Sequence, residues 1–116
     1  YTDVRKAAES ITEYGAKIVL ITLGEKGSFV YLQDQQEAYV SGYSSKVVDT
    51  TGAGDSFMGG FLYKICESGK HIEEYSLQEM IECVRFGNAM ASLCVEREGA
   101  IPAMPVMEEV IKRINN

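Results

Sequence analysis

The chain has 116 residues, of which 46 % are hydrophobic and 24 % are charged, and its formal net charge is −6. This length predicts one domain or part of one. An acidic chain lacks the basic face that nucleic acids and anionic membranes require, so we expect neither as a partner. The sequence also has no apolar run approaching the ~20 residues of a membrane-spanning helix.

The chain is predicted to begin with a helix followed by a buried strand. Val4, Ala8 and Ile11 recur at helical spacing within residues 3–14, and a glycine follows. The next segment, residues 17–23, is almost continuously apolar and has the length of a strand. Such a run is typical of a strand buried on both faces, so we expect it to lie in a parallel sheet.

Three shorter segments are predicted to be extended. They are rich in β-branched or aromatic residues, and glycine or polar turn residues separate them. They comprise residues 28–32, 37–40 and 46–48. The last of them leads directly into a glycine-rich turn, and the overall pattern is α/β.

The second half is predicted to be mainly helical. One helix is expected from about residue 54 to residue 67, another from Ser76 to about residue 95, and a last one from Pro105. Ser76 and Glu79 have the spacing of a capping box, which marks the start of the second of these helices. The buried face of the first is marked by Phe57, Met58, Phe61, Leu62 and Ile65.

The most informative segment is the run Asp49-Thr50-Thr51-Gly52-Ala53-Gly54-Asp55. Glycines at a helix start let a ligand approach the backbone and leave the first N–H groups unpaired. Together with the helix dipole, these groups suit a transferring phosphoryl group. An ordinary tight turn is the alternative, which the flanking Asp and Thr residues disfavour.

Asp55 follows these glycines in the first turn of the predicted helix. We expect its carboxylate to take the proton of a substrate hydroxyl as a general base. The alternative is an aspartate that only caps the helix. Asp49 lies on the other side of the turn, where bracing the loop is the first interpretation and binding a cation is the second.

The glycines after the first predicted strand form a second candidate site. Thr22, Gly24 and Gly27 lie where a strand ends, and ligands of open α/β sheets bind at such ends. The segment has neither the Gly-x-Gly-x-x-Gly pattern nor the P-loop pattern, so it is neither a Rossmann fingerprint nor a P-loop.

The cysteines and the single histidine are not predicted to do chemistry. Cys66, Cys83 and Cys94 lack metal-ligand spacing and lie in apolar helical stretches. We expect them to be reduced core cysteines of a cytoplasmic protein. His71 lies in a polar stretch and is expected to be exposed, which disfavours a Ser-His-Asp triad or a histidine metal site.

Taken together, these segments resemble the ribokinase (PfkB-type) family of sugar kinases. Residues 49–57, followed by Gly59-Gly60-Phe61, resemble the second signature of that family. Residues 22–27 lie at a suitable distance upstream, and residues 99–102 lie at a suitable distance downstream. The resemblance covers most of this chain but only the C-terminal part of a family member. It implies the C-terminal part of a ribokinase-like three-layer α/β/α fold, with the N-terminal sugar-binding and lid part absent.

The resemblance also implies a role for each residue of the glycine turn. Asp55 would be the catalytic base, and Gly52, Ala53 and Gly54 would form the anion hole. Asp49 and Thr51 would belong to a site for a monovalent cation such as K⁺.

Further residues would hold the nucleotide. Those implied to lie along its phosphates and ribose are Thr22, Gly24 and Gly27. Those implied to border its adenine are Asn88, Gly99 and Ala100.

The function implied for the parent protein is the phosphorylation of a sugar hydroxyl by ATP, with Mg²⁺ as cofactor. Residues 99–105 and the turn at residues 23–28 resemble the fructokinase-type branch most. Ribokinase, 2-keto-3-deoxygluconate kinase, fructosamine-type kinases and nucleoside kinases are alternatives, and a non-catalytic nucleotide-binding module is an alternative of another class. Because half of the substrate cradle is lacking, we expect the chain to be inactive alone. Surface exposed by truncation also predicts self-association, such as a homodimer.

Overall fold

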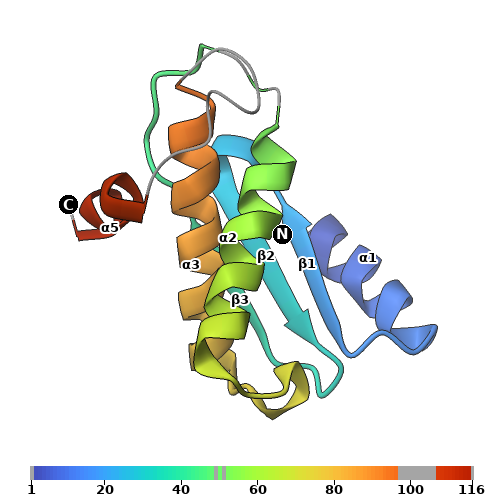
Figure 1. Cartoon of the computed structure of the whole chain (residues 1–116). Helices are drawn as coiled ribbons and strands as arrows, with labels where there is room; N and C mark the ends of the chain where they lie inside the picture. The colour runs from blue at the N-terminus through green and yellow to red at the C-terminus, as the bar shows by residue number, and fades with distance from the viewer. Residues whose placement is uncertain (1, 49, 51, 97–106, 116) are drawn as a thin grey trace.

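The computed structural model describes residues 2–48, 50, 52–96 and 107–115 (Figure 1). The helices and strands, in chain order, are α1 (Thr2–Glu13), β1 (Ile18–Thr22), the 3₁₀ helix η1 (Gly24–Lys26), β2 (Gly27–Leu32), β3 (Glu37–Ser41), α2 (Ala53–Ser68), the 3₁₀ helix η2 (Ile72–Glu74), α3 (Leu77–Cys94) and α5 (Met107–Asn115). The helices predicted in the described ranges are present, with ends that differ by about a residue. The predicted start of the last helix, Pro105, lies outside the described residues.

The three strands form an antiparallel meander in the order β1-β2-β3. Val19 of β1 pairs with Tyr31 of β2, and Val30 of β2 pairs with Ala38 of β3. The expectation that β1 lies in a parallel sheet is therefore wrong for the pairing seen here. The connection through η1 is too short for the crossover that parallel neighbours need. Residues 46–48, which were also predicted to be extended, join no strand.

Helices cover both faces of this sheet (Figure 1). Successive side chains of a strand point to opposite faces. Phe29 and Tyr31 of β2 pack with Ala8 of α1 on one face. Val30 and Leu32 pack on the other face against α2 and α3. This three-layer α/β/α arrangement is the expected fold class, and it explains why β2 is buried along its whole length.

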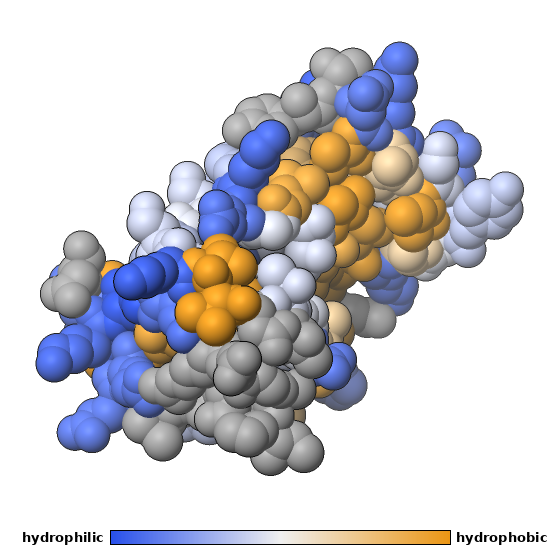
Figure 2. Space-filling view, turned by 90° about the horizontal axis from the view of Figure 1, so that it is seen from above, coloured by the Kyte–Doolittle hydropathy of each residue, from blue (hydrophilic) through white to orange (hydrophobic). Residues whose placement is uncertain are grey.

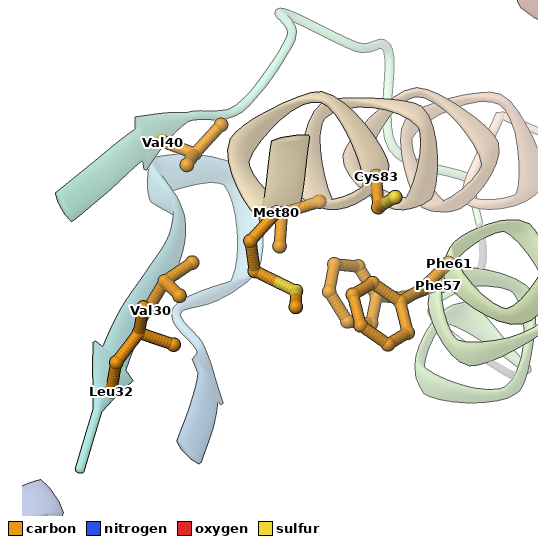
Figure 3. Close-up of a cluster of buried hydrophobic side chains, with 8 residues drawn as sticks. Val30, Leu32, Val40, Phe57, Phe61, Met80 and Cys83 are labelled. Atoms are coloured by element: carbon orange, nitrogen blue, oxygen red, sulfur yellow. The ribbon is translucent and has the colours of Figure 1, made fainter. Parts of the chain in front are cut away.

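The largest hydrophobic cluster lies between the sheet and helices α2 and α3 (Figure 3). Its buried members are Val30, Leu32, Val40, Phe57, Phe61, Met80, Cys83 and Val84. The rings of Phe57 and Phe61 stack with their centroids 6.3 Å apart. The prediction of a buried face on α2 is confirmed for these two residues. It is wrong for Met58 and Leu62, which are 44 % and 48 % exposed because they lie on the side of α2 away from this cluster.

Two glycines allow α2 and α3 to approach each other closely. A Cβ added to Gly87 of α3 would lie 2.8 Å from the carbonyl oxygen of Phe57. A Cβ added to Gly60 of α2 would lie 2.6 Å from Cγ of Met90. Both glycines lie within helices, so the space between the helices, rather than an unusual backbone angle, requires glycine here.

The capping box predicted at the start of α3 is confirmed. Ser76 Oγ accepts a hydrogen bond from the Glu79 N–H at 3.1 Å, and Glu79 Oε1 accepts one from the Ser76 N–H at 3.0 Å. These reciprocal bonds satisfy N–H groups that a helix start otherwise leaves unpaired.

The cysteine prediction is correct for two of the three residues. Cys83 and Cys94 are buried and unbridged, whereas Cys66 is exposed. Cys66 follows Leu62 by four residues, so it continues the exposed face of α2. His71 is exposed as predicted. In the part of the chain that the structure describes, no helix is both long and apolar enough to span a membrane.

Candidate active site

A pocket of about 210 Å³ lies at the end of the molecule where β1 ends and α2 begins. Its walls come from the end of β1, η1, the start of β2, the loop after β3, the first turn of α2 and the C-terminal half of α3. These segments meet at the top of Figure 1. Figure 2 looks down on this end and shows hydrophobic surface gathered on the side where Figure 1 places α1 and β1.

The pocket brings together residues that the sequence singled out in three separate segments. The predicted site residues that line it are Thr22, Gly24, Gly27, Ala53, Gly54 and Asn88. Gly52 and Asp55 adjoin Ala53 and Gly54 in the chain. Asp49, Thr51, Gly99 and Ala100 lie outside the described residues, so their roles stay predictions.

The first turn of α2 forms part of the wall of this pocket through Ala53 and Gly54. Gly52, the N-cap residue, has φ 81° and ψ 1°, a left-handed conformation that favours glycine. No side chain among the described residues caps the helix. The N–H of Ala53 donates to the carbonyl of Thr50 at 3.2 Å, so it already has an acceptor. The Ser56 N–H donates to the carbonyl of Gly52 at 2.8 Å. The N–H groups of a first helical turn carry the positive end of the helix dipole, which favours a negatively charged ligand there.

Asp55 lies in the same turn, directly after Gly54. Its side chain is exposed and has no hydrogen-bond or ion-pair partner within the described ranges. Asp55 therefore lies next to the pocket residues Ala53 and Gly54, and its role as a base stays a prediction.

Asn88 forms part of the pocket wall, but its amide is engaged within the protein. Its Oδ1 accepts a hydrogen bond from Ser28 Oγ at 2.7 Å, and its Nδ2 donates to the carbonyls of Val40 and Ser41 at 3.2 and 3.3 Å. These bonds connect α3 to β2 and β3. The structure thus shows a role in holding the wall together, which the sequence did not predict.

A pair of glycines at the end of the sheet shapes the same wall. Gly27 has φ 114°, and a Cβ on it would lie 2.1 Å from the carbonyl oxygen of Val40. A Cβ on Gly42 would lie 2.5 Å from the carbonyl oxygen of Glu25. Gly42 was missed in the sequence, where an isolated glycine after a strand was its only signal.

The loop after β3 is held over the pocket by a polar cluster. Glu96 Oε2 accepts the N–H of Lys46 at 3.1 Å, and Oε1 accepts from Arg113 of α5 at 2.7 Å. Arg113 also donates to the carbonyl of Ser44 at 3.0 Å. Tyr43 of this loop lines the pocket, and burial raises the pKa of its hydroxyl.

The described ranges contain no group of three His, Cys, Asp or Glu side chains that could hold a metal ion. Mg²⁺ commonly needs only one or two carboxylates, because substrate phosphates and water supply its other ligands. The side chains present therefore fit a metal that arrives with a phosphate ligand better than a metal caged by protein.

Comparison with known proteins identifies the family. The model of the pfkB family carbohydrate kinases matches residues 1–107. The chain belongs to this family. An uncharacterized sugar kinase of Archaeoglobus fulgidus is 45 % identical over 103 residues, which cover 89 % of this chain and 37 % of that protein. Fructokinase-2 of Solanum lycopersicum is 38 % identical over 106 residues, covering 91 % of this chain and 31 % of that protein.

Solved structures of pfkB kinases have the same fold as this chain. The ribokinase of Arabidopsis thaliana, complexed with ribose and ATP, superposes with a TM-score of 0.83 at 38 % identity, over 100 % of this chain and 35 % of that one. The fructokinase of Vibrio cholerae in its fructose, ADP and calcium bound form gives a TM-score of 0.84 at 28 % identity, over 96 % of this chain and 35 % of that one. The chain thus has a ribokinase-like fold and spans about a third of the relatives it matches.

Proposed function

We propose that this chain is the C-terminal nucleotide-binding and catalytic part, residues 1–116, of a kinase that uses ATP to phosphorylate a sugar hydroxyl. The observation that carries the proposal is the meeting of Thr22, Gly24 and Gly27 with the first turn of α2 at one pocket. The membership of the pfkB family supports the reaction class. A pocket of about 210 Å³ is below the usual range of about 300–1,000 Å³ for ligand sites, so it suits part of a nucleotide.

The chemistry follows from the positions of Asp55 and of the start of α2. A substrate hydroxyl oxygen attacks the γ-phosphorus, its bond to phosphorus forms, the bond to the β–γ bridging oxygen breaks, and ADP leaves. Asp55 takes the hydroxyl proton. The backbone N–H groups at the start of α2 stabilise negative charge on the transferring group without reorganising. Such stabilisation is the main contribution that proteins make to this reaction.

Fructose is the sugar that we propose first. Residues 99–105 resemble the fructokinase branch, and a fructokinase is among the relatives at 38 % identity. Ribose is the second candidate, because a ribokinase structure superposes at the same identity. Mg²⁺ is the proposed cofactor, and Asp49 and Thr51 are proposed to belong to a K⁺ site.

The first test is the substitution Asp55→Asn in the full-length kinase that contains this chain. Removing a general base should lower kcat with fructose or ribose by about 10²–10⁴-fold. The affinity for ATP should stay within twofold, since the carboxylate does not line the pocket. Asp3→Asn on α1 is the matched control, because Asp3 also lies in the first turn of a helix but away from the pocket. An unchanged kcat for Asp55→Asn would exclude the proposed base.

A non-catalytic nucleotide-binding module is the alternative. It would bind ATP with equal affinity before and after Asp55→Asn and show no sugar-dependent turnover in either form. The isolated 116-residue chain should likewise show no turnover, because it spans only about a third of a relative. Sugar-dependent ATP consumption by the isolated chain would contradict this expectation.

A further inference from the structure

The segment that follows β3, residues 43–48, forms one wall of the pocket with every second residue. The residues of this wall segment that line the pocket are Tyr43, Ser45 and Val47. The residues that alternate with them have backbone groups hydrogen-bonded to the C-terminal part of the chain, and they are Ser44, Lys46 and Val48. A period of two is typical of an extended chain, in which successive residues point to opposite sides. The wall segment therefore has one side at the pocket and the other side on a support.

Two charged side chains supply most of this support. Arg113 of α5 donates to the carbonyl of Ser44 at 3.0 Å and, through its other terminal nitrogen, to Glu96 Oε1 at 2.7 Å. The second oxygen of Glu96, Oε2, accepts the N–H of Lys46 at 3.1 Å. The Arg113 and Glu96 side chains are only 22 % and 27 % exposed, so water weakens their interaction less than that of a pair on the open surface. Charge-assisted hydrogen bonds thus hold the wall segment at two points.

The helix that carries Arg113 is itself fixed by apolar packing. Val110 of α5 is fully buried in a cluster with Phe86 and Leu93 of α3, and Tyr43 of the wall segment packs against the same cluster. A side chain on a packed helix holds its partner more precisely than a side chain on a loop does. Arg113 therefore connects the wall of the pocket to the packed pair of helices α3 and α5.

Building on the proposed nucleotide site, we propose that Glu96 and Arg113 are positioning residues that set the affinity for ATP through the wall segment. Neither side chain lines the pocket, so both act by keeping the wall in the arrangement that binds the nucleotide. When the pair is broken, the wall spends only part of its time in that arrangement, and the apparent affinity falls by the same fraction. The start of α2 has a support of its own, the hydrogen bond from the Ser56 N–H to the carbonyl of Gly52. The chemical step is therefore affected much less than ATP binding.

The test is the substitution Arg113→Gln in the full-length kinase that contains this chain. We expect the KM for ATP to rise about tenfold, as for a wall that adopts the binding arrangement a tenth of the time, and kcat to stay within about twofold. Glu96→Gln should act similarly, and the double variant should add little, because the two residues act as one unit. An unchanged KM in folded Arg113→Gln, or a fall in kcat as large as the rise in KM, would overturn the inference. A parent kinase without sugar-dependent ATP turnover would instead overturn the proposed function, so the two failures are distinguishable.

Two further variants separate the hydrogen bonds from the charge and from the stability of α5. Lys112→Gln is the matched control, because it removes the same charge from the same last turn of α5 at an exposed position, and it should leave the KM for ATP unchanged. Arg113→Lys keeps the charge, but a single ammonium does not span two acceptors as the guanidinium fork does. Its KM should lie between those of the parent and Arg113→Gln, which also tests the proposal if Arg113→Gln does not fold. An equal rise in KM for Lys112→Gln, or a parental KM for Arg113→Lys, would contradict the role of the two hydrogen bonds.

Discussion

Gly87 of α3 faces Phe57 of α2 at a distance that leaves no room for a methyl group. A Cβ at this position would lie 2.8 Å from the Phe57 carbonyl oxygen and 2.9 Å from two ring carbons of Phe57. The carbonyl belongs to the backbone of α2, so it cannot rotate away. We expect Gly87→Ala to lower the free energy of unfolding by about 1–3 kcal/mol, as overpacking does in well-packed cores. Urea denaturation of the two purified proteins measures the difference.

Gly59→Ala is the matched control for this prediction. Gly59 also lies inside a helix, but a Cβ there would have no neighbouring atom within 4 Å. Alanine should therefore leave the stability unchanged or raise it by up to about 1 kcal/mol, since glycine is a poor helix residue. Equal losses in both variants would show that helix propensity, rather than the contact with Phe57, controls the effect at Gly87.

Single residues differ in how far their roles could be predicted from the sequence. The role of Gly52 at a helix start followed from its local pattern, and its left-handed backbone agrees with the turn expected there. Gly87 and Asn88 depend on α2, β2 and β3, which lie far away in the sequence. No local pattern carries that information, so the tight helix contact and the hydrogen bonds of Asn88 became visible only in the structure.

At the scale of whole elements, the spacing of apolar residues predicted whether a segment is a helix or a strand better than it predicted how strands pair or which side of a helix is buried. The apolar run of β1 correctly predicted a strand, but not its antiparallel neighbour, and only Val19 of this strand is buried although burial on both faces was expected. Apolar positions on α2 predicted a helix correctly. The apolar positions predicted a wider buried face on α2 than the structure has. The sheet and α3 cover Phe57 and Phe61 but not Met58 and Leu62.

The capping box of α3 makes the stability of this element depend on pH. The pKa of the Glu79 carboxyl is lowered to about 2, first by its hydrogen bond with Lys70 and then by the Ser76 N–H. A lowered folded-state pKa gives stability that is complete above the unfolded value of about 4.3 and is lost as pH falls towards the folded value. The free energy of unfolding should therefore fall between about pH 5 and pH 2.

Glu79→Gln should flatten this pH dependence, because the substituted side chain does not titrate. Unfolding by urea at several pH values between 2 and 6 gives the measurement. Gln78→Ala, a change of a neutral exposed side chain in the same helical turn, is the control and should keep the slope of the parent chain. If Glu79→Gln retained that slope, another group would be responsible for the acid dependence.

At the scale of the molecule, the outer face of α2 remains uncovered. Met58 and Leu62 are 44 % and 48 % exposed, and they lie one turn apart on the side of the helix that carries Asp55. The chain spans 35 % of the Arabidopsis ribokinase structure. The exposed fractions of Met58 and Leu62 therefore apply to the isolated 116-residue chain. We expect the stability of that chain not to depend on these two apolar side chains.

The double substitution Met58→Gln and Leu62→Gln tests this expectation. The free energy of unfolding of the isolated chain should change by no more than about 0.5 kcal/mol, as surface substitutions usually do. Binding of a hydrophobic dye should decrease, because an exposed apolar area is lost. Met80→Gln introduces the same side chain at a fully buried position and should cost several kcal/mol, since it buries an unpaired amide. If the double variant lost as much free energy of unfolding as Met80→Gln, the outer face of α2 would be covered in solution. Self-association of the chain through this face would produce that outcome.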